Sequence, residues 1–274
     1  GTHYSFGVYM SGSYNSYDNT SHVLTVKNCT IDVKAHTYAY GVFSQGAVNS
    51  TNGGCYHGDI ELTNCDVTAE TTVGAYSYAA FVTSRVATIY KNASADAANY
   101  YHGEYGSAGK LTINSGTYKA YSKTTTAYCV SAGNEWSGEA RARTVYADET
   151  NVALTQHLGG NVEAYPTLII HGGDFYAETF GTTTARAVSS GGHTTIDGGT
   201  FKAVAKTNNA YGLVAVSGTM KATGITMEAE ANASAYGVLV SAGISDYTMF
   251  DYAADVELNN CDVTATTRTG TEAR

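Results

Sequence analysis

Charged side chains are scarce in this chain of 274 residues. Asp, Glu, Lys and Arg make up 14% of it, against about 25% in globular domains, so Thr, Ser, Asn, Gly and Tyr must form most of the surface. Basic residues number 15 and acidic residues 24, and the sequence pI is about 5.3. Nucleic acids and anionic membrane surfaces need a basic binding patch, so this balance argues against both partners.

Proline, cysteine and long apolar runs are also limited. The single proline, Pro166, stands beside 30 glycines, and this composition predicts many turns in a regular β-structure. Five cysteines are an odd number that fits no simple disulfide framework. No Cys-x-x-Cys or Cys/His pair has the spacing of zinc ligands, so we expect no metal and no cofactor. No run of about 18 apolar residues occurs, so no membrane insertion is expected.

What the chain does contain is a repeat, seen most clearly at residues 194–218, TTIDGGTFKAVAKTNNAYGLVAVSG. The unit reads as a short alternating strand, a glycine turn, a second strand, a polar bend and a third strand. The shortest spacing between units is 26 residues, and seven units begin near Leu24, Ile60, Leu111, Leu168, Thr194, Met220 and Val256. A period of about 20–50 residues predicts a solenoid whose units bury their apolar faces against each other.

Residues at equal positions of the units predict which side chains face inward. In the second strand, inward ladders run through Phe201 and Ala203, and the outward row between them includes Lys119, Tyr176 and Lys202, which we interpret as an exposed row without functional role. The third strand carries an aromatic row interrupted by an arginine. Because Gly, Ala and Ser occupy the neighbouring positions on both faces, the sequence leaves open whether this row faces the core or the solvent. We expect one left-handed residue at the corner after each first strand: Asn28, Asn64, Ser115, Gly172, Gly198, Gly224 and Asn260.

Three strands per unit without a helix predict an all-β fold, a three-sided right-handed parallel β-helix of about seven rungs in one domain over residues 1–274. The corner ladder, the inward stacks and phrases such as GGTFKA and AYGVLVSAG resemble the pectin-lyase-like superfold, and most of all the repeat regions of large bacterial surface proteins. The resemblance covers nearly the whole chain. It implies the fold and leaves the function open, because that fold carries lyases, hydrolases, tailspikes and adhesins alike.

Both ends of the chain resemble interrupted repeats. Residues 4–12 match the last third of a unit, and the C-terminus stops in mid-unit. We therefore expect a slice of a longer protein whose repeats continue, and the lack of a secretory signal carries little weight.

Extra residues enter at one corner, just after the third strand, at 13–22, 47–58, 85–109, 134–166 and 244–254. Insertions at one corner of a solenoid often build its binding face, and the units that begin at Leu168 and Thr194 have none, which predicts a notch. Asp148 and Gly159 would cap a short helix in the longest insertion. Aromatic rings there offer rigid area for sugars or proteins, unless they pack on the flank. The predicted binding residues are Tyr56, Tyr90, Tyr100, Tyr101, His102, Tyr105, Trp136 and Tyr146.

A catalytic site is the weaker hypothesis, with His171, Asp174 and Asp197 as candidates. His171 and Asp197 occupy equal outward positions on adjacent units, about 4.8 Å apart, and Asp174 follows beyond the corner. A histidine with two carboxylates suits acid–base chemistry, whereas a polar cross-strand pair is the structural alternative. The outward carboxylates Asp66, Asp174 and Asp262 lie on units that are not neighbours, so they do not form the carboxylate pair of a glycoside hydrolase.

Two cysteines, Cys29 and Cys65, are expected to stack as buried thiols on adjacent units, although strand geometry leaves a disulfide open. Cys129 takes the place of Gly41 in another unit and is expected to be buried, whereas Cys55 falls in a loop.

The leading functional hypothesis is a non-enzymatic extracellular domain on a bacterial cell surface, acting as stalk and adhesin. Its aromatic corner would bind a host glycan, glycoprotein or immunoglobulin. The first alternative is a polysaccharide lyase or glycoside hydrolase of the same superfold. The second is a structural filament or coat subunit, which would stack end to end through unpaired terminal strands.

Overall fold

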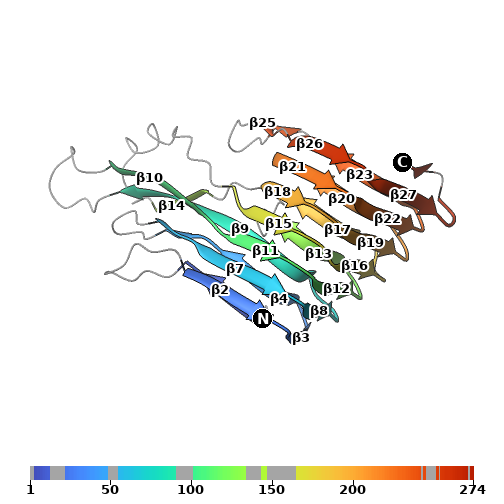
Figure 1. Ribbon diagram of the computed structural model, residues 1–274, viewed down its shortest axis with the longest axis horizontal. Helices are drawn as coiled ribbons and strands as arrows, with labels where there is room; N and C mark the ends of the chain where they lie inside the picture. The colour runs from blue at the N-terminus through green and yellow to red at the C-terminus, as the bar shows by residue number, and fades with distance from the viewer. Residues whose placement is uncertain are drawn as a thin grey trace.

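Figure 1 shows a computed structural model in which strands stack side by side along one axis. The structure describes residues 3–12, 22–48, 55–90, 101–133, 143–146, 165–241, 243–244, 251–252, 254–270 and 272–274, and these contain strands and turns but no helix. Three parallel sheets form the three sides of a right-handed β-helix with about seven rungs, as the repeat predicts. The predicted helix between Asp148 and Gly159 lies outside the described residues.

Each rung contributes one strand to each sheet. The first sheet contains β2 (His22–Lys27), β7 (Gly58–Thr63), β11 (Lys110–Ile113), β15 (Thr167–Ile170), β18 (His193–Ile196), β21 (Gly218–Thr223) and β26 (Ala254–Asn259). The second sheet contains β3 (Thr30–Ala35), β8 (Cys65–Thr71), β12 (Gly116–Ser122), β16 (Asp174–Thr179), β19 (Gly199–Ala205), β22 (Ile225–Ala231) and β27 (Asp262–Thr267). The third sheet contains β1 (Tyr4–Ser11), β4 (Tyr38–Gln45), β9 (Tyr76–Tyr90), β13 (Thr126–Ala132), β17 (Ala185–Ser190), β20 (Ala210–Ala215), β23 (Ser234–Val240) and β28 (Glu272–Ala273).

Additional strands occur only between a third-sheet strand and the next first-sheet strand within the described part of the chain, which is the corner where the insertions are predicted. The long strand β9 pairs there with β10 antiparallel and with β14 parallel. The added strands are β5 (Ala47–Val48), β6 (Cys55–Tyr56), β10 (Tyr101–Ala108), β14 (Arg143–Tyr146), β24 (Gly243–Ile244) and β25 (Asp251–Tyr252).

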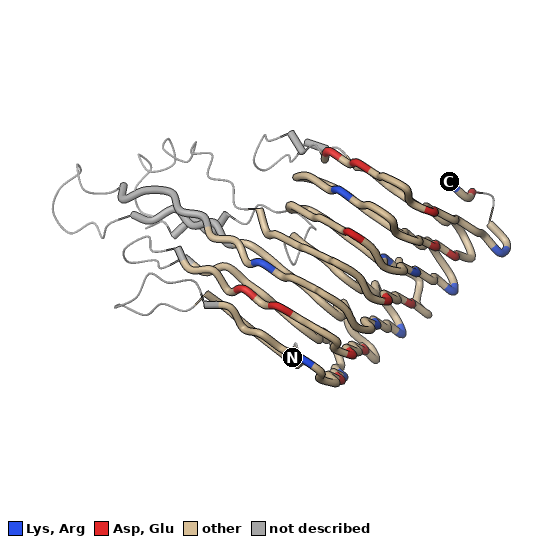
Figure 2. The backbone as a smooth tube through the Cα atoms, viewed as in Figure 1, with Lys and Arg blue, Asp and Glu red and all other residues tan. Residues whose placement is uncertain are grey.

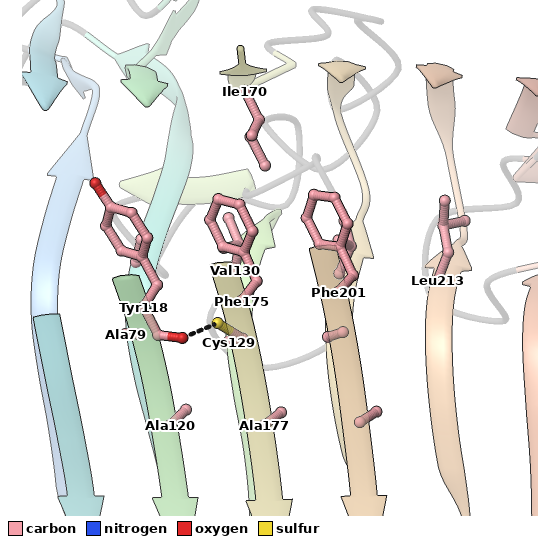
Figure 3. Close-up of a cluster of buried hydrophobic side chains, with 14 of the residues drawn as sticks. Ala79, Tyr118, Ala120, Cys129, Val130, Ile170, Phe175, Ala177, Phe201 and Leu213 are labelled. Atoms are coloured by element: carbon pink, nitrogen blue, oxygen red, sulfur yellow. Dashed lines mark hydrogen bonds between the residues drawn. The ribbon is translucent and has the colours of Figure 1, made fainter. Parts of the chain in front are cut away.

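The interior is filled by ladders of equivalent residues, as the repeat predicts. Tyr118, Phe175 and Phe201 stack in the second sheet with ring centroids 5.1 and 4.6 Å apart, and all three are buried. Figure 3 shows these rings side by side, with Ala120 and Ala177 in the next row. Parallel strands bring equal positions to the same depth, so one apolar position repeated in every rung produces one continuous core.

The corner between the first and second sheets differs in part from the prediction. Asn28, Asn64, Gly224 and Asn260 have φ between 51° and 64°, as expected. In the three other rungs the positive φ belongs instead to the following residue, at Gly116, Gly173 and Gly199. Where the second corner position is Cys or Ile, its side chain must avoid positive φ, so the strain moves to the preceding Asn or Gly. Where that second position is glycine, the glycine takes the positive φ and the preceding residue does not need it.

In the strands of the third sheet, simple alternation along the sequence does not show which side chains face the core. Consecutive residues both point into the core at Ala79 and Ala80, and again at Cys129 and Val130. The inward side therefore shifts by one residue in mid-strand, and the period of two breaks. Residues just before this shift, such as Tyr78, face outward, and those just after it, such as Phe81, also face outward and pack in a cluster separate from the main core.

Candidate binding cleft

The predicted aromatic corner has one described side chain among its predicted binding residues. Tyr56 is buried, with 7% of its surface exposed. The backbones of the other strand residues are placed, on β9, β10 and β14, but their side chains lie outside the described part of the chain: Tyr90, Tyr101, His102, Tyr105 and Tyr146. Tyr100 and Trp136 lie outside the described residues altogether. The binding prediction for this corner therefore stays a prediction.

The structure brings together two of the three catalytic candidates. His171 Nδ1 lies 3.1 Å from Asp197 Oδ2, because the pairing of β15 with β18 places the two residues on adjacent rungs. About half of each side chain is exposed, at 49% and 52%. Asp174 lies beyond the corner, at the start of β16, and no hydrogen bond joins it to the pair. The geometry is that of a solvent-exposed cross-strand pair.

Asp174 instead lines a cleft of about 330 Å³ on the outer face of the second sheet. The cleft spans rungs three, four and five. Its lining comes from β12, β16 and β19: Thr117, Lys119, Tyr121, Asp174, Phe175, Tyr176, Thr200 and Lys202. The register of these strands places Lys119, Tyr176 and Lys202 in one outward row and Thr117, Asp174 and Thr200 in the next. The cleft thus combines aromatic rings, ammonium groups, hydroxyls and one carboxylate.

Charged residues of both signs gather along the second sheet, as Figure 2 shows, and most of its lysines are paired. Lys34 Nζ lies 3.1 Å from Glu70, Lys202 Nζ 2.9 Å from Glu228, and Lys206 Nζ 2.9 Å from Glu178; Lys123 also pairs with Glu70. Exposed pairs of this kind contribute only about 0–1 kcal/mol each. Each of these ammonium groups therefore already has a carboxylate partner within the protein.

Lys119 is the exception among the described lysines of the second sheet. Its neighbours in the outward row are Thr68 and Tyr176, and neither carries a counter-charge. Asp174 lies in the adjacent row and likewise forms no ion pair with a described residue, since the described salt bridges involve neither side chain. The cleft therefore presents one unpaired ammonium group and one unpaired carboxylate to a ligand.

The two tyrosines of the cleft, Tyr121 and Tyr176, do not stack. Their ring centroids are 5.8 Å apart and the ring planes are inclined by 51°. Burial raises the pKa of both phenols above the usual value, and the nearby Glu178 carboxylate adds to this shift. Both hydroxyls therefore keep their protons well above neutral pH, that of Tyr176 with the Glu178 carboxylate as its hydrogen-bond acceptor.

The row of Lys119, Tyr176 and Lys202, which the sequence predicts to be exposed, lines this cleft. The unpaired state of Lys119 has a signal in the sequence. Lys202 is followed by Glu228 in the next rung, whereas Lys119 is flanked by Thr68 and Tyr176 and so has no acidic neighbour. The hollow itself depends on side-chain packing across three rungs, which no single strand reveals.

The structure confirms buried thiols at Cys65 and Cys129, whereas Cys29 is less buried than predicted and Cys55 lies on a short strand instead of in a loop. Cys29, Cys65, Cys129 and Cys261 are free thiols. Cys65 and Cys129 are fully buried, Cys29 is half-buried, and Cys129 Sγ lies 3.1 Å from the Tyr118 carbonyl oxygen (Figure 3). Burial raises the pKa of the Cys129 thiol, so this group stays protonated and unreactive. Cys55 lies on β6, with its side chain outside the described part of the chain.

The described residues contain no group of three or more His, Cys, Asp or Glu side chains that could hold a metal ion. No helix long and apolar enough to cross a membrane is found among them. Comparisons with protein-family models, curated proteins and solved structures gave no match.

Proposed function

We propose that this chain is a non-catalytic binding domain of a bacterial surface solenoid, and that it holds a glycan in the cleft of rungs three to five. The observation that carries the proposal is the combination in one cleft of two tilted tyrosine rings with the unpaired ammonium group of Lys119. Tyrosine offers a rigid apolar face and a hydroxyl, which suits a sugar ring with its own apolar face and hydroxyls.

The solenoid supplies the stalk in this proposal. Adjacent rungs are joined by backbone hydrogen bonds in all three sheets, so the scaffold is rigid along its axis. The resemblance to repeat regions of bacterial surface proteins motivates the extracellular location. The cleft lies on a regular sheet face, so its side chains are held on rigid strands rather than on loops.

Binding is favoured over hydrolysis by the lining of the cleft. It supplies one carboxylate, Asp174, whereas a glycoside hydrolase of the usual type uses two, about 5–9.5 Å apart. Glu178 lies on the same strand but is buried, with 9% of its surface exposed, and is paired with Lys206.

A glycan array followed by calorimetry with the best ligand tests the proposal. We expect Tyr176→Ala to weaken binding by about tenfold or more, since loss of a stacked ring costs about 1–3 kcal/mol. Lys221→Gln is the matched control, because Lys221 lies on the first sheet, outside the cleft lining, and is already paired with Glu257. Absence of any glycan ligand, or equal affinity of Tyr176→Ala and the unmodified chain, would overturn the proposal.

A further inference from the structure

The aromatic row on the outer face of the third sheet contains one cation, Arg186 on β17. The register aligns Arg186 with Tyr128 on β13 and with Tyr211 on β20. Its guanidinium carbon lies 5.3 Å from the centre of the Tyr128 ring and 5.6 Å from the centre of the Tyr211 ring. Arg186 thus occupies the place that tyrosine holds in the neighbouring rungs, with an aromatic ring on either side.

The hydrogen-bonding edge of Arg186 has no partner in the part of the chain that the structure describes. A guanidinium has five N–H donors in one plane, and rings at both faces leave only this edge for hydrogen bonds. The Nε atom is buried and forms no hydrogen bond, and no ion pair involves Arg186 among the described residues. Thr183 Oγ1, three residues earlier in the same rung, is likewise buried and without a partner.

Two unsatisfied polar groups in one rung are unusual, because buried donors and acceptors nearly always have partners. The two other arginines with described side chains show the normal pattern, since Arg268 pairs with Glu230 and Arg274 with Glu272. A permanently charged side chain held between two rings, with its donors free, is set up to receive an anion from outside the protein.

We propose that Arg186, flanked by Tyr128 and Tyr211, is a binding site for the carboxylate group of a ligand. A carboxylate is planar and accepts two parallel N–H bonds from the edge of a guanidinium, the one side that the rings leave open. The site is on the third sheet and the cleft on the second, so this proposal does not depend on the glycan proposal.

The surroundings favour a ligand with a single negative charge. Arg186 is the one cation among the aligned residues from β1 to β23, whose other members are Phe6, Tyr40, Tyr78, Tyr128, Tyr211 and Tyr236, and Arg274 beyond them is paired with Glu272. A polyanion would need cations repeated along the row. The rung is also free of inserted strands, because only Gly191 and Gly192 separate β17 from β18. Arg186 is half-buried as a residue while its Nε is buried, so a small ligand fits this position better than a large one.

Nuclear magnetic resonance of the arginine Nε–H groups tests this site directly, because the chain has only six arginines. Sodium acetate is titrated into the protein, with sodium chloride at the same ionic strength as the reference. We expect a saturable shift of the Arg186 Nε–H signal with acetate alone. Glucuronate and N-acetylalanine, each with one carboxylate, then distinguish a sugar acid from a peptide carboxyl terminus by which one binds more tightly.

The Arg186→Lys variant keeps the charge but loses the planar edge. Backbone amide shifts near Arg186 should show acetate binding weakened about tenfold or more, and Arg268→Lys is the matched control that should leave it unchanged. Two results would overturn the proposal: no saturable acetate shift in the unmodified chain, or equal acetate affinity in Arg186→Lys. The titration of the unmodified chain decides the matter even if the variant does not fold.

Discussion

Tyrosine side chains project from both the third sheet and the second sheet, at the same strand spacing, yet their rings are arranged differently. On the third sheet, Tyr40 and Tyr78 have centroids 5.2 Å apart and ring planes only 2° from parallel. On the second sheet, Tyr121 and Tyr176 are 5.8 Å apart and inclined by 51°. Tyr40 and Tyr78 are buried, with 0% and 3% exposed, whereas Tyr176 is half-buried in a cleft.

The register of the strands accounts for this difference. Tyr40 and Tyr78 are direct partners in the pairing of β4 with β9, so their rings meet face to face. Tyr121 pairs with Glu178, and Tyr176 pairs with Lys119, so the two cleft tyrosines are diagonal neighbours and cannot stack flat. A ring covered on both faces by other rings contributes to stability, whereas a tilted ring leaves one face for a ligand. The same residue type thus has a structural role in one sheet and, in our proposal, a binding role in the other.

The largest expected difference is between Tyr40→Ala and Tyr176→Ala. Tyr40 is fully buried, so its removal leaves a cavity and should lower the free energy of unfolding by about 3–5 kcal/mol. Tyr176→Ala should lower it by about 1 kcal/mol, since the ring is already part of an open cleft. Urea denaturation of both variants measures this. Equal losses would show that the two tyrosine sets are not structurally distinct.

Both faces depend on strict register, which the corner residues maintain. Gly116 has φ of 127°, and a Cβ there would lie 2.1 Å from the Cys65 carbonyl oxygen, so Gly116→Ala should cost about 2–3 kcal/mol. Gly224 has φ of 64° with nothing within 4 Å of a Cβ, so the control Gly224→Ala should cost only about 1 kcal/mol. Thermal unfolding separates the two. A larger loss for Gly224→Ala would contradict this account of the corner.

Alkaline pH should destabilise the fold through its buried phenols. Burial raises the pKa of Tyr118, Tyr128 and Tyr176 above 10.0, so the unfolded chain loses these protons first. Their stabilisation is fully present below about pH 10 and decreases as the pH rises towards the folded-state pKa, by up to about 1.4 kcal/mol per pH unit and group. When denaturation is measured between pH 8 and about pH 11, the free energy of unfolding should fall less steeply with pH in Tyr118→Phe than in the unmodified chain. An unchanged slope in that variant would contradict the assignment.

The smallest expected effect is that of Lys119→Gln on stability. Because Lys119 forms no ion pair with a described residue, the free energy of unfolding should change by less than about 0.5 kcal/mol. The matched variant Lys206→Gln removes the partner of buried Glu178 and should cost more, about 1–3 kcal/mol. Denaturation curves give both values. If Lys119→Gln were the more destabilising change, Lys119 would have a structural role rather than a binding one.

The sequence by itself determined the repeat, the number of rungs and the inward ladders. Equal positions such as Tyr118, Phe175 and Phe201 must stack once parallel strands are in register, so local pattern and global fold agree. The burial of Cys129 followed in the same way from its glycine equivalent, Gly41.

Only the tertiary structure decided the features in which the rungs differ. The outward direction of Tyr78 depends on a mid-strand shift that a period of two cannot show. The close approach of Gly116 to the Cys65 carbonyl oxygen likewise depends on the neighbouring rung. The cleft with Lys119, and Arg186 between two rings, neither of them in an ion pair with a described residue, arise from contacts between residues 25 to 58 positions apart in the sequence. Such pairings are set by register across the sheets, which is a property of the assembled solenoid and of no single strand.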